Sequence, residues 1–429
     1  MSIILGCIAD DLTGATDLAM ILVREGMKTV QVVGEPNADT PAPDAEAVVV
    51  ALKSRTNDAQ EAISMTINSC KWLQSLGAKQ IFFKYCSTFD STDKGNIGPV
   101  TDALMSHLGC SSTIACPAFP ENKRTVYRGY LFVNDGLLSE SSLRNHPLTP
   151  MKDANLNRIL STQSSANISN LYFEEIEMGH EVISQTIAEK DTGPRTIHIT
   201  DALNDNHLRS IGKACKNMKL VTGGSAVAQG LPLNFQEQGL LSSRREEQLF
   251  SAPKGPSVIL SGSCSEATRS QVNYAQNHLP SFCLDAVEIL NNEAVVEKAV
   301  TWAADRIKAD TPVLLYSSAD PAVVKQIQSN QNQVDVGSRV EAVIGEIAQQ
   351  LHALGACRFV VAGGETSGAV INALDVKTMS IGPQIDPGVP WTTTTVDKKT
   401  IALALKSGNF GTEDFFIKAL NQLKQYEIS

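Results

Sequence analysis

Short apolar, β-branched runs alternate with longer amphipathic segments along the first half of the chain. The runs that we predict as strands cover residues 3–9, 29–33, 47–52, 80–85, 114–118, 196–200 and 219–221. Helices are predicted over 13–24 and 59–76, because apolar residues recur there every three or four positions, and a further helix is expected to open near Ile97. Buried strands separated by helices are typical of a parallel sheet that is covered on both faces.

Residues 230–256 interrupt this alternation with Pro232, Gly239, a charge cluster at 244–247 and two prolines at 253 and 256. Such turn-forming residues are typical of a domain boundary. Strands are then predicted over 257–260, 312–316, 358–362 and 401–405, and helices over 266–276, 340–354 and 367–374. We therefore expect an α/β protein of two domains, each a mostly parallel sheet flanked by helices, with boundaries at 1–235 and 250–429.

Length, charge and cysteine content narrow the class of protein. The chain has 429 residues, which agrees with two domains, and a net charge of −10. This acidity argues against nucleic acid or a membrane surface as the main partner, but it leaves room for a small anionic ligand. The nine cysteines form no C-x-x-C pair, the N-terminus lacks a basic leader, and no run approaches the roughly 18 apolar residues of a membrane span. We therefore expect a cytoplasmic protein.

Three glycine-rich segments follow predicted strands in the second half. They are SGSCS at 261–265, GGETSG at 363–368 and KSGNFG at 406–411. Glycines let the backbone approach an anion, and free N–H groups at a helix start can donate to it. The alternative is that these glycines only permit tight turns, but three such segments together favour a nucleotide site. The Walker A and dinucleotide fingerprints are absent, which disfavours a Walker-type NTPase and a nicotinamide-dependent dehydrogenase.

Two adjacent carboxylates, Asp10 and Asp11, follow the first predicted strand. Buried carboxylates are costly unless they bind a group or cap a helix. Either Asp11 or Thr13 can be the cap, and this leaves Asp10 unexplained. We therefore predict that Asp10 is a general base or a ligand for polyol hydroxyls.

Cationic and polar side chains follow the third and fourth predicted strands. Arg55, Lys84 and Lys94 could hold a small carboxylate, and short polar groups could bind hydroxyls, so the predicted substrate-binding residues are Asp11, Arg55, Lys84, Ser87, Asp90 and Lys94. The alternative is a solvated loop with helix caps. The histidines and cysteines show no nucleophile–base or metal-binding spacing.

Several segments of the chain, taken together, resemble those of a known family. It is similar along its whole length to the four-carbon acid sugar kinase family, and most closely to the branch that phosphorylates 3-oxo-tetronate at its 4-hydroxyl. The segments that carry the resemblance are 8–17 (IADDLTGATD), 83–100 (FKYCSTFDSTDKGNIGPV), 124–133 (RTVYRGYLFV), 146–151, 220–225, 260–265, 360–368, 381–391 and 404–411.

The resemblance implies ATP-dependent phosphorylation of a four-carbon sugar acid, with a substrate domain followed by a nucleotide domain. The nucleotide contacts that it implies are Ser261, Ser263, Gly363, Gly364, Glu365, Thr366 and Gly408, although which serine of the first loop contacts ATP stays open. We expect Mg²⁺ to accompany ATP, and Glu365 and Asp386 are candidates to bind the metal or a water on it, although its ligands stay open. The alternatives are a D-threonate or D-erythronate kinase of the same family and a non-catalytic binding protein, and a homodimer is compatible with the sequence.

Overall fold

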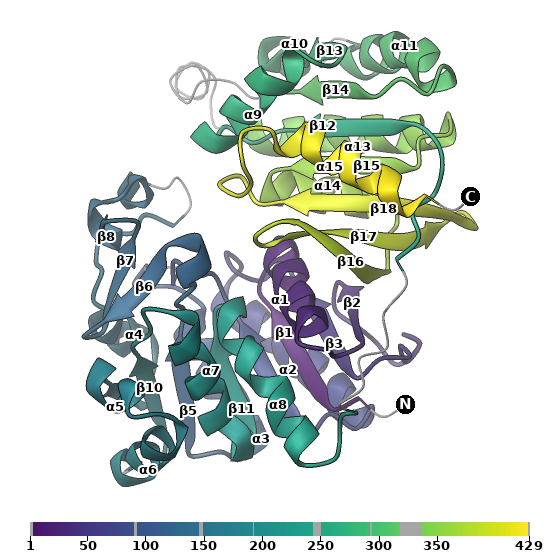
Figure 1. The fold of residues 1–429 in the computed structure, drawn as a ribbon. Helices are drawn as coiled ribbons and strands as arrows, with labels where there is room; N and C mark the ends of the chain where they lie inside the picture. Colours follow the sequence, from purple (N-terminus) through teal and green to yellow (C-terminus); the bar gives the residue numbers. More distant parts are fainter. Residues whose placement is uncertain are drawn as a thin grey trace. The chain divides into compact units, whose positions relative to one another are not determined.

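The computed structural model describes residues 3–89, 92–145, 149–191, 193–242, 250–291, 294–317 and 336–427. The chain forms two compact units, Met1–Glu247 and Gln248–Ser429. Each unit contains its own sheet with helices on both faces (Figure 1), so the predicted α/β architecture of two mostly parallel domains is confirmed.

The first unit alternates strands and helices from its first residues onward. Its strands are β1 (Leu5–Ala9), β2 (Thr29–Val33), β3 (Ala47–Ala51), β4 (Gln80–Lys84), β5 (Ser112–Cys116), β6 (Arg124–Tyr127), β7 (Tyr130–Val133), β8 (Gly136–Leu137), β9 (Asn167–Leu171), β10 (Thr196–Thr200) and β11 (Leu220–Gly223). Its α-helices are α1 (Leu12–Arg24), α2 (Ala59–Ser75), α3 (Ile97–Leu108), α4 (Leu156–Gln163), α5 (Phe173–Glu177), α6 (His180–Lys190), α7 (Asp205–Ala214) and α8 (Leu231–Glu237).

The main sheet of this unit is parallel, with strand order β2-β3-β1-β4-β11-β5-β10-β9. Helices α1, α7 and α8 lie on one face, and α2 and α3 lie together on the other (Figure 1). β1, β3 and β4 are buried at every position, which explains the continuous apolar sequences of β1 and β3 and the apolar centre of β4. The chain leaves β1 toward β2 on one side and later reaches β4 on the other, so the end of β1 lies at a switch point of the sheet.

A small antiparallel sheet of β6, β7 and β8 extends from the first unit, and the sequence reasoning did not predict it. β6 and β7 are joined by a two-residue turn in which Arg128 and Gly129 both have positive φ angles of 53° and 74°. This is the hairpin turn that matches strand twist. The N–H groups of both turn residues donate to the buried carboxylate of Asp201, at 2.8 and 2.9 Å. The contact with the distant Asp201 therefore stabilises this turn, which the sequence of residues 127–130 alone predicts only weakly.

The second unit has one sheet and helices on both faces. Its strands are β12 (Ser257–Ser261), β13 (Ser281–Cys283), β14 (Val313–Tyr316), β15 (Arg358–Ala362), β16 (Thr378–Asp386), β17 (Val389–Val396) and β18 (Lys399–Lys406). Its described helices are α9 (Glu266–Gln276), α10 (Ala286–Leu290), α11 (Val295–Lys308), α13 (Val336–Ala353), α14 (Gly364–Ala373) and α15 (Phe415–Leu423). The strand order is β13-β14-β12-β15-β18-β17-β16.

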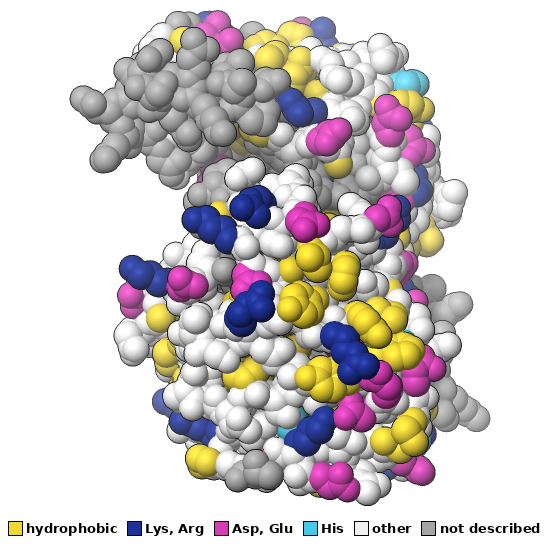
Figure 2. Space-filling view, turned by 90° about the vertical axis from the view of Figure 1, so that its left-hand side faces the viewer, with side chains coloured by type: hydrophobic (Ala, Val, Ile, Leu, Met, Phe, Trp, Pro, Cys, Tyr) yellow, Lys and Arg dark blue, Asp and Glu magenta, His cyan; other side chains and the backbone are white. Residues whose placement is uncertain are grey.

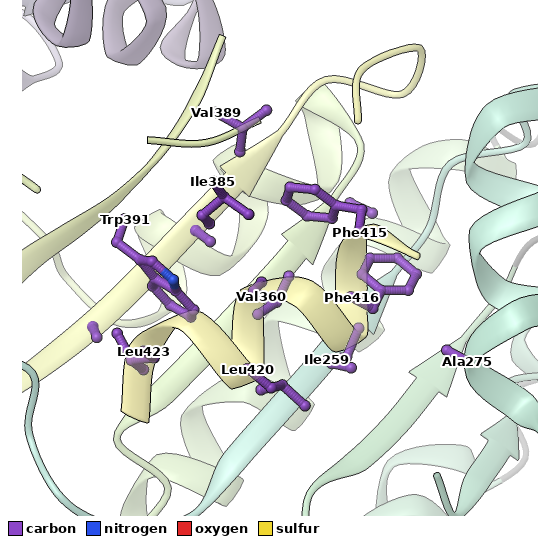
Figure 3. Close-up of a cluster of buried hydrophobic side chains, with 14 of the residues drawn as sticks. Ile259, Ala275, Val360, Ile385, Val389, Trp391, Phe415, Phe416, Leu420 and Leu423 are labelled. Carbon is purple, nitrogen blue, oxygen red and sulfur yellow. The ribbon is translucent and has the colours of Figure 1, made fainter. Parts of the chain in front are cut away.

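The core of the second unit forms where α15 packs against the sheet (Figure 3). Phe416, Leu420 and Leu423 of this helix are buried together with side chains of the sheet, among them Ile259, Val360 and Trp391. Figure 3 shows these side chains gathered between the helix and the strands. Burying aromatic and aliphatic side chains in this way contributes roughly 1.5–3 kcal/mol for each fully buried residue. The carboxyl-terminal helix therefore anchors the sheet from which the glycine loops emerge.

Two local predictions differ from the structure, and one pair of strands is an addition to them. Helix α14 begins at Gly364 rather than at residue 367, because Gly363 has a φ of 123° and its carbonyl accepts the Ser367 N–H at 2.8 Å. The stretch predicted as a linker from residue 230 begins with α8, because Pro232 lies in the first turn, where its missing N–H costs nothing. The antiparallel strands β16 and β17 were not predicted.

Candidate functional site

The carboxyl ends of β1, β3 and β4 meet at one edge of the first sheet. Ala9 is paired with Ala51 on one side and with Lys84 on the other. The backbone continues this register, since the Asp10 N–H donates to the Lys84 carbonyl at 3.0 Å and the Ser54 N–H donates to the Asp10 carbonyl at 3.1 Å. The loops that carry the predicted carboxylates and cations are therefore neighbours.

Arg55 pairs with both carboxylates that follow β1. Its Nε and Nη2 donate to the two oxygens of Asp10 at 2.9 and 2.7 Å, and Nη2 lies 2.7 Å from Asp11 Oδ1. Asp10 is only 5% exposed. A bidentate guanidinium–carboxylate pair fixes both partners in orientation as well as in charge. Asp10 is therefore held in one orientation at the edge of the sheet.

Asp11 is the N-cap of α1, as one of the two sequence interpretations allowed. Its carboxylate accepts from the Gly14 N–H at 3.2 Å and from the Thr13 hydroxyl at 2.9 Å. Burial alone would raise the pKa of Asp11, but the charges of Arg55 and Lys84 outweigh it and lower that pKa below its usual value. Asp11 is thus ionised and already engaged by the protein.

Lys84 ends β4 and is 4% exposed. Its ammonium lies against Gly14, where any Cβ would collide with it. Within the described residues it has no hydrogen bond and no ion pair within 4 Å, although its charge acts on Asp11 and Asp17. A buried ammonium without a close counter-ion is costly. Lys84 is therefore the side chain of this edge that is best suited to receive an anion.

Asn96 supports the loop that carries Arg55. It is buried, and its side-chain amide lies within hydrogen-bonding distance of the carbonyls of Ser54, Arg55 and Asn57, at 2.9, 3.2 and 3.0 Å. The sequence reasoning placed Asn96 only within a polar loop. Its role could not be identified from the sequence, because the carbonyls that it contacts lie about forty positions earlier.

The remaining predicted residues of the first unit are less closely connected. Ser87 is half-buried in the loop after β4, and Lys94 is exposed before α3. Among the described residues, no hydrogen bond or ion pair joins either side chain to the group around Arg55. Asp90 lies outside the described residues.

Asp17 is a buried carboxylate that the sequence reasoning missed. It lies on α1 and is 4% exposed, and Oδ2 accepts a short hydrogen bond from Ser225, which follows β11. Its other oxygen, Oδ1, has no hydrogen-bond partner in the part of the chain that the structure describes. Burial raises the pKa of Asp17 to about 6, against a smaller opposing effect of Lys84. Its place at the end of the segment 8–17, which carries the family resemblance, was the signal that the sequence offered.

This raised pKa predicts how Asp17 affects stability. The folded protein binds more protons than the unfolded chain between pH 4 and 6, so ionisation of Asp17 destabilises the fold progressively as the pH rises through that range. Asp17→Asn should therefore gain stability relative to the wild type between pH 4 and 7, by up to about 3 kcal/mol. Thermal unfolding against pH measures this, with exposed Asp39→Asn as control. A difference in Tm that stays constant with pH would contradict it.

In the second unit, three strand ends meet in the same way. Ser261 of β12 is paired with Ala362 of β15, and Ala362 is paired with Lys406 of β18. The backbone again continues the register, since the Gly262 N–H donates to the Ala362 carbonyl and the Gly363 N–H donates to the Lys406 carbonyl, at 3.2 and 2.8 Å. The three glycine-rich segments are therefore side by side.

Hydroxyl groups join the first and third of these segments. Ser265 is the N-cap of α9, and its hydroxyl donates to the Gly408 carbonyl at 2.6 Å. Thr268, one turn into the helix, donates to the same carbonyl at 2.8 Å. Ser263 lies beside Ser265, with 3.2 Å between their hydroxyl oxygens. The segments thus form one connected surface rather than three separate turns.

The glycines of this surface differ in what they do. A Cβ at Gly408 would lie 2.6 Å from the Ser263 hydroxyl, and one at Gly363 would lie 2.7 Å from that of Thr366. These two positions need glycine for close packing. A Cβ at Gly364 meets no atom within 4 Å, so nothing in the fold itself requires glycine there. Gly364, exposed Glu365 and Thr366 form the first turn of α14, where N–H groups lack helical partners.

The two acidic residues predicted as metal ligands differ in their surroundings. Asp386 accepts from the N–H and hydroxyl of Thr412, at 2.9 and 3.0 Å, and pairs closely with Lys418. One oxygen of Asp386 thus holds the loop before α15 and the other pairs with Lys418 of that helix, which disfavours Asp386 as a metal ligand. Glu365 is exposed beside the glycine surface. The described residues contain no group of three or more His, Cys, Asp or Glu side chains arranged to bind a metal ion.

Charged side chains of both signs lie on the face of the molecule shown in Figure 2. Figure 2 shows Lys and Arg side chains interspersed with Asp and Glu on the face in view. None of the described helices is long and apolar enough to cross a membrane.

The comparisons with known proteins assign the two units. A family model described as a sugar-binding N-terminal domain matches residues 5–231, and one described as a nucleotide-binding C-terminal domain matches residues 258–416. The 3-oxo-tetronate kinase of Burkholderia multivorans is 50% identical over 98% of this chain and 97% of its own. That of Pseudomonas fluorescens is also 50% identical, with the same coverage.

Two solved structures share the fold of this chain at 39% sequence identity. The crystal structure of Haemophilus influenzae protein HI1011 has a TM-score of 0.77 and 39% identity, covering 97% of this chain and 100% of that one. A Salmonella typhimurium LT2 crystal structure has a TM-score of 0.85 at 39% identity, covering 97% and 99%. The matches span both units and include the two edges described above. This chain therefore belongs to the four-carbon acid sugar kinase family.

Proposed function

We propose that this protein transfers the γ-phosphoryl group of ATP to the 4-hydroxyl of 3-oxo-tetronate, forming 3-oxo-tetronate 4-phosphate. The observation that supports this most directly is the 50% identity, over 98% of the chain, with proteins that are named 3-oxo-tetronate kinases. The first unit would bind the sugar acid and the second the nucleotide. An enzyme that uses ATP and a free small acid would work in the cytoplasm, and we propose that location.

The sugar acid would bind at the edge formed by β1, β3 and β4. Lys84 and Arg55 would hold its carboxylate, since one cation lacks a close partner and the other presents a fixed guanidinium. Asp10 would accept the proton of the 4-hydroxyl. Its oxygens each keep a lone pair beyond the one used by Arg55, so a hydroxyl can still donate to it. The contributors proposed around them are Asp11, Ser87, Asp90 and Lys94.

The nucleotide would bind on the glycine surface of the second unit. The residues proposed to contact it are Ser261, Ser263, Gly363, Gly364, Glu365, Thr366 and Gly408. Backbone N–H groups and hydroxyls there would hold the polyphosphate, which is the main task in phosphoryl transfer, because that chemistry depends on positioning and charge stabilisation.

We propose that Mg²⁺ arrives bound to ATP. Mg²⁺ in such sites keeps several waters and needs only one or two carboxylates besides phosphate oxygens, so a dedicated acidic cluster is not required. Glu365 fits this requirement, because it is an exposed carboxylate in the first turn of α14. When bound, Mg²⁺ neutralises charge on the phosphate oxygens.

The family alternatives, D-threonate and D-erythronate kinases, differ only in the acceptor. The named relatives favour the oxo-acid. A non-catalytic binding protein would keep the strand edges of both sheets but would show no turnover. Separately, a homodimer stays a prediction from the sequence.

ADP release with MgATP tests this proposal directly. The acceptors would be 3-oxo-tetronates of both configurations, threonate, erythronate and a blank without acceptor. We expect kcat/KM for one oxo-acid to exceed that for threonate and erythronate by at least about 100-fold. A ketone oxygen only accepts hydrogen bonds and lies on a planar carbon, whereas the C3 hydroxyl of the other acids lies on a tetrahedral carbon and brings a donor that a site built for the ketone leaves unpaired. Highest turnover with threonate or erythronate would show that the acceptor of this kinase is that acid and not 3-oxo-tetronate. Nucleotide binding without ADP release from any acceptor would favour the binding protein.

A further inference from the structure

Lys406 is a buried cation that opens the third glycine-rich segment, 406–411, but it is not among the proposed nucleotide contacts and has no assigned role. It is the last residue of β18, and its side chain is 0% exposed. Its ammonium donates to the Thr268 hydroxyl at 2.9 Å and to the carbonyls of Ser407 and Gly408 at 3.0 and 2.9 Å. All of these partners are neutral. In the described part of the chain, no carboxylate lies within ion-pairing distance of it.

The contacts of Lys406 converge on the loop that follows β18. The Gly408 carbonyl accepts from Ser265 at 2.6 Å, from Thr268 at 2.8 Å and from Lys406 at 2.9 Å. One turn further along α9, the Gln271 amide lies 3.0 Å from each of the carbonyls of residues 410, 411 and 412. Carbonyl oxygens that faced a phosphate would repel it. Here the hydroxyl, ammonium and amide groups named above hydrogen-bond to these carbonyls.

The charge on Lys406 is expensive in the absence of a ligand. Burial of an ammonium without a counter-ion disfavours the charged form, and it lowers the pKa of Lys406 to about 7. The other charged groups of this region are already paired or exposed, since Asp386 binds Lys418 and Glu365 faces solvent. The groups that face the Lys406 ammonium are the Thr268 hydroxyl and the carbonyls of Ser407 and Gly408. A polyanion bound at the glycine surface would supply the missing negative charge.

We propose that Lys406 is a positioning residue of the nucleotide site: it fixes the loop at 407–411 through the Gly408 carbonyl, and the polyphosphate of the nucleotide is its counter-ion. The inference rests on the proposed nucleotide contacts of this surface and adds a residue to them. It requires no contact between Lys406 and the nucleotide, because a charge beneath the loop acts across one layer of neutral atoms.

Isothermal titration of the full chain with ADP, AMP and adenosine tests this. Lys406→Met should weaken ADP binding by about 10- to 100-fold, because the attraction between opposite charges separated by one layer of atoms in a partly buried site is of that order. It should change adenosine binding by less than about threefold, because adenosine carries no phosphate charge. The matched control is Lys399→Met, because Lys399 is exposed at the other end of the same strand. It should bind all three ligands as the wild type does. A purely structural role would weaken all three alike.

A second measurement follows the proton that ADP binding would return to Lys406. Titration with ADP at pH 8 in two buffers of different ionisation enthalpy should show uptake of up to one proton by the wild type and by Lys399→Met, and none by Lys406→Met. Thr268→Val, which keeps the charge but removes one contact with Lys406, should weaken ADP binding and retain the proton uptake. Thr268→Val also tests the proposal if Lys406→Met does not fold.

The two proposals fail differently. Unchanged ADP affinity in Lys406→Met, equal loss for ADP and adenosine, or no proton uptake by the wild type would each overturn the role of Lys406 while leaving the nucleotide site in place. Absence of ADP binding to the wild type would overturn the nucleotide site and this inference together.

Discussion

Replacing Asp10 by asparagine is expected to lower kcat by about 10²- to 10⁴-fold while ADP binding to the second unit is unchanged. Asparagine fits the same space but cannot accept the proton that the 4-hydroxyl loses. The two oxygens of Asp10 are held by Arg55 at 2.9 and 2.7 Å, so the wild-type carboxylate is oriented before substrate arrives. Steady-state kinetics with 3-oxo-tetronate and MgATP provide the measurement, with exposed Asp39→Asn as the matched control.

The division of the effect between kcat and KM separates two roles of Asp10. If Asp10 accepts the proton, the loss lies in kcat. If it only orients Arg55 toward the sugar acid, KM rises and kcat stays near normal. The second outcome would contradict the assignment of Asp10 as the base. Thermal unfolding of the variant must accompany the kinetics, because Asp10 is buried and its loss leaves Arg55 paired with Asp11 alone.

Lys84→Met is expected to raise KM for the sugar acid by about 10- to 100-fold with a smaller effect on kcat. A charge-assisted hydrogen bond to a carboxylate is worth about 1.5–3 kcal/mol, which corresponds to this range. Methionine has nearly the same length as lysine and removes a buried ammonium that has no close counter-ion among the described residues, so the unliganded fold should not lose stability. Initial rates at varied sugar acid, together with Tm, measure both effects.

The control for this variant is Lys79→Met, because Lys79 is exposed just before the same strand. It should leave KM unchanged. A normal KM in Lys84→Met would show that the carboxylate binds elsewhere. A strong loss of stability would show that the Lys84 charge supports the fold through Asp11 and Asp17.

The elements that the sequence predicted well are those with local causes. β1 and β3 read as continuous apolar runs because both faces are buried. α9 was predicted at its observed bounds, and Ser265 caps its first residue. The hairpin of β6 and β7 was missed because its turn depends on Asp201, more than seventy positions away. The start of α14 was misplaced because the helix begins inside a glycine motif that reads as a loop.

The candidate site divides in the same way. Asp10 and Arg55 stood out because they follow strands, and Lys84 because it lies at the end of one, since strand ends of a parallel sheet meet at one edge. The pairing of Asp10 with Arg55 could not be foreseen, because it spans 45 positions and depends on the register of β1 with β3. Asp17 and Lys406 were missed because nothing local distinguishes a buried charge from a solvated one.

The sequence by itself determined the alternation of strands and helices, the division into two α/β domains and the family, because periodicity, turn chemistry and ordered motifs are properties of nearby residues. Only the tertiary structure decided which charges are paired, which are buried without a counter-ion and which carbonyls the loops turn inward. These depend on strand register and burial, and both are set by contacts between residues that lie far apart along the chain.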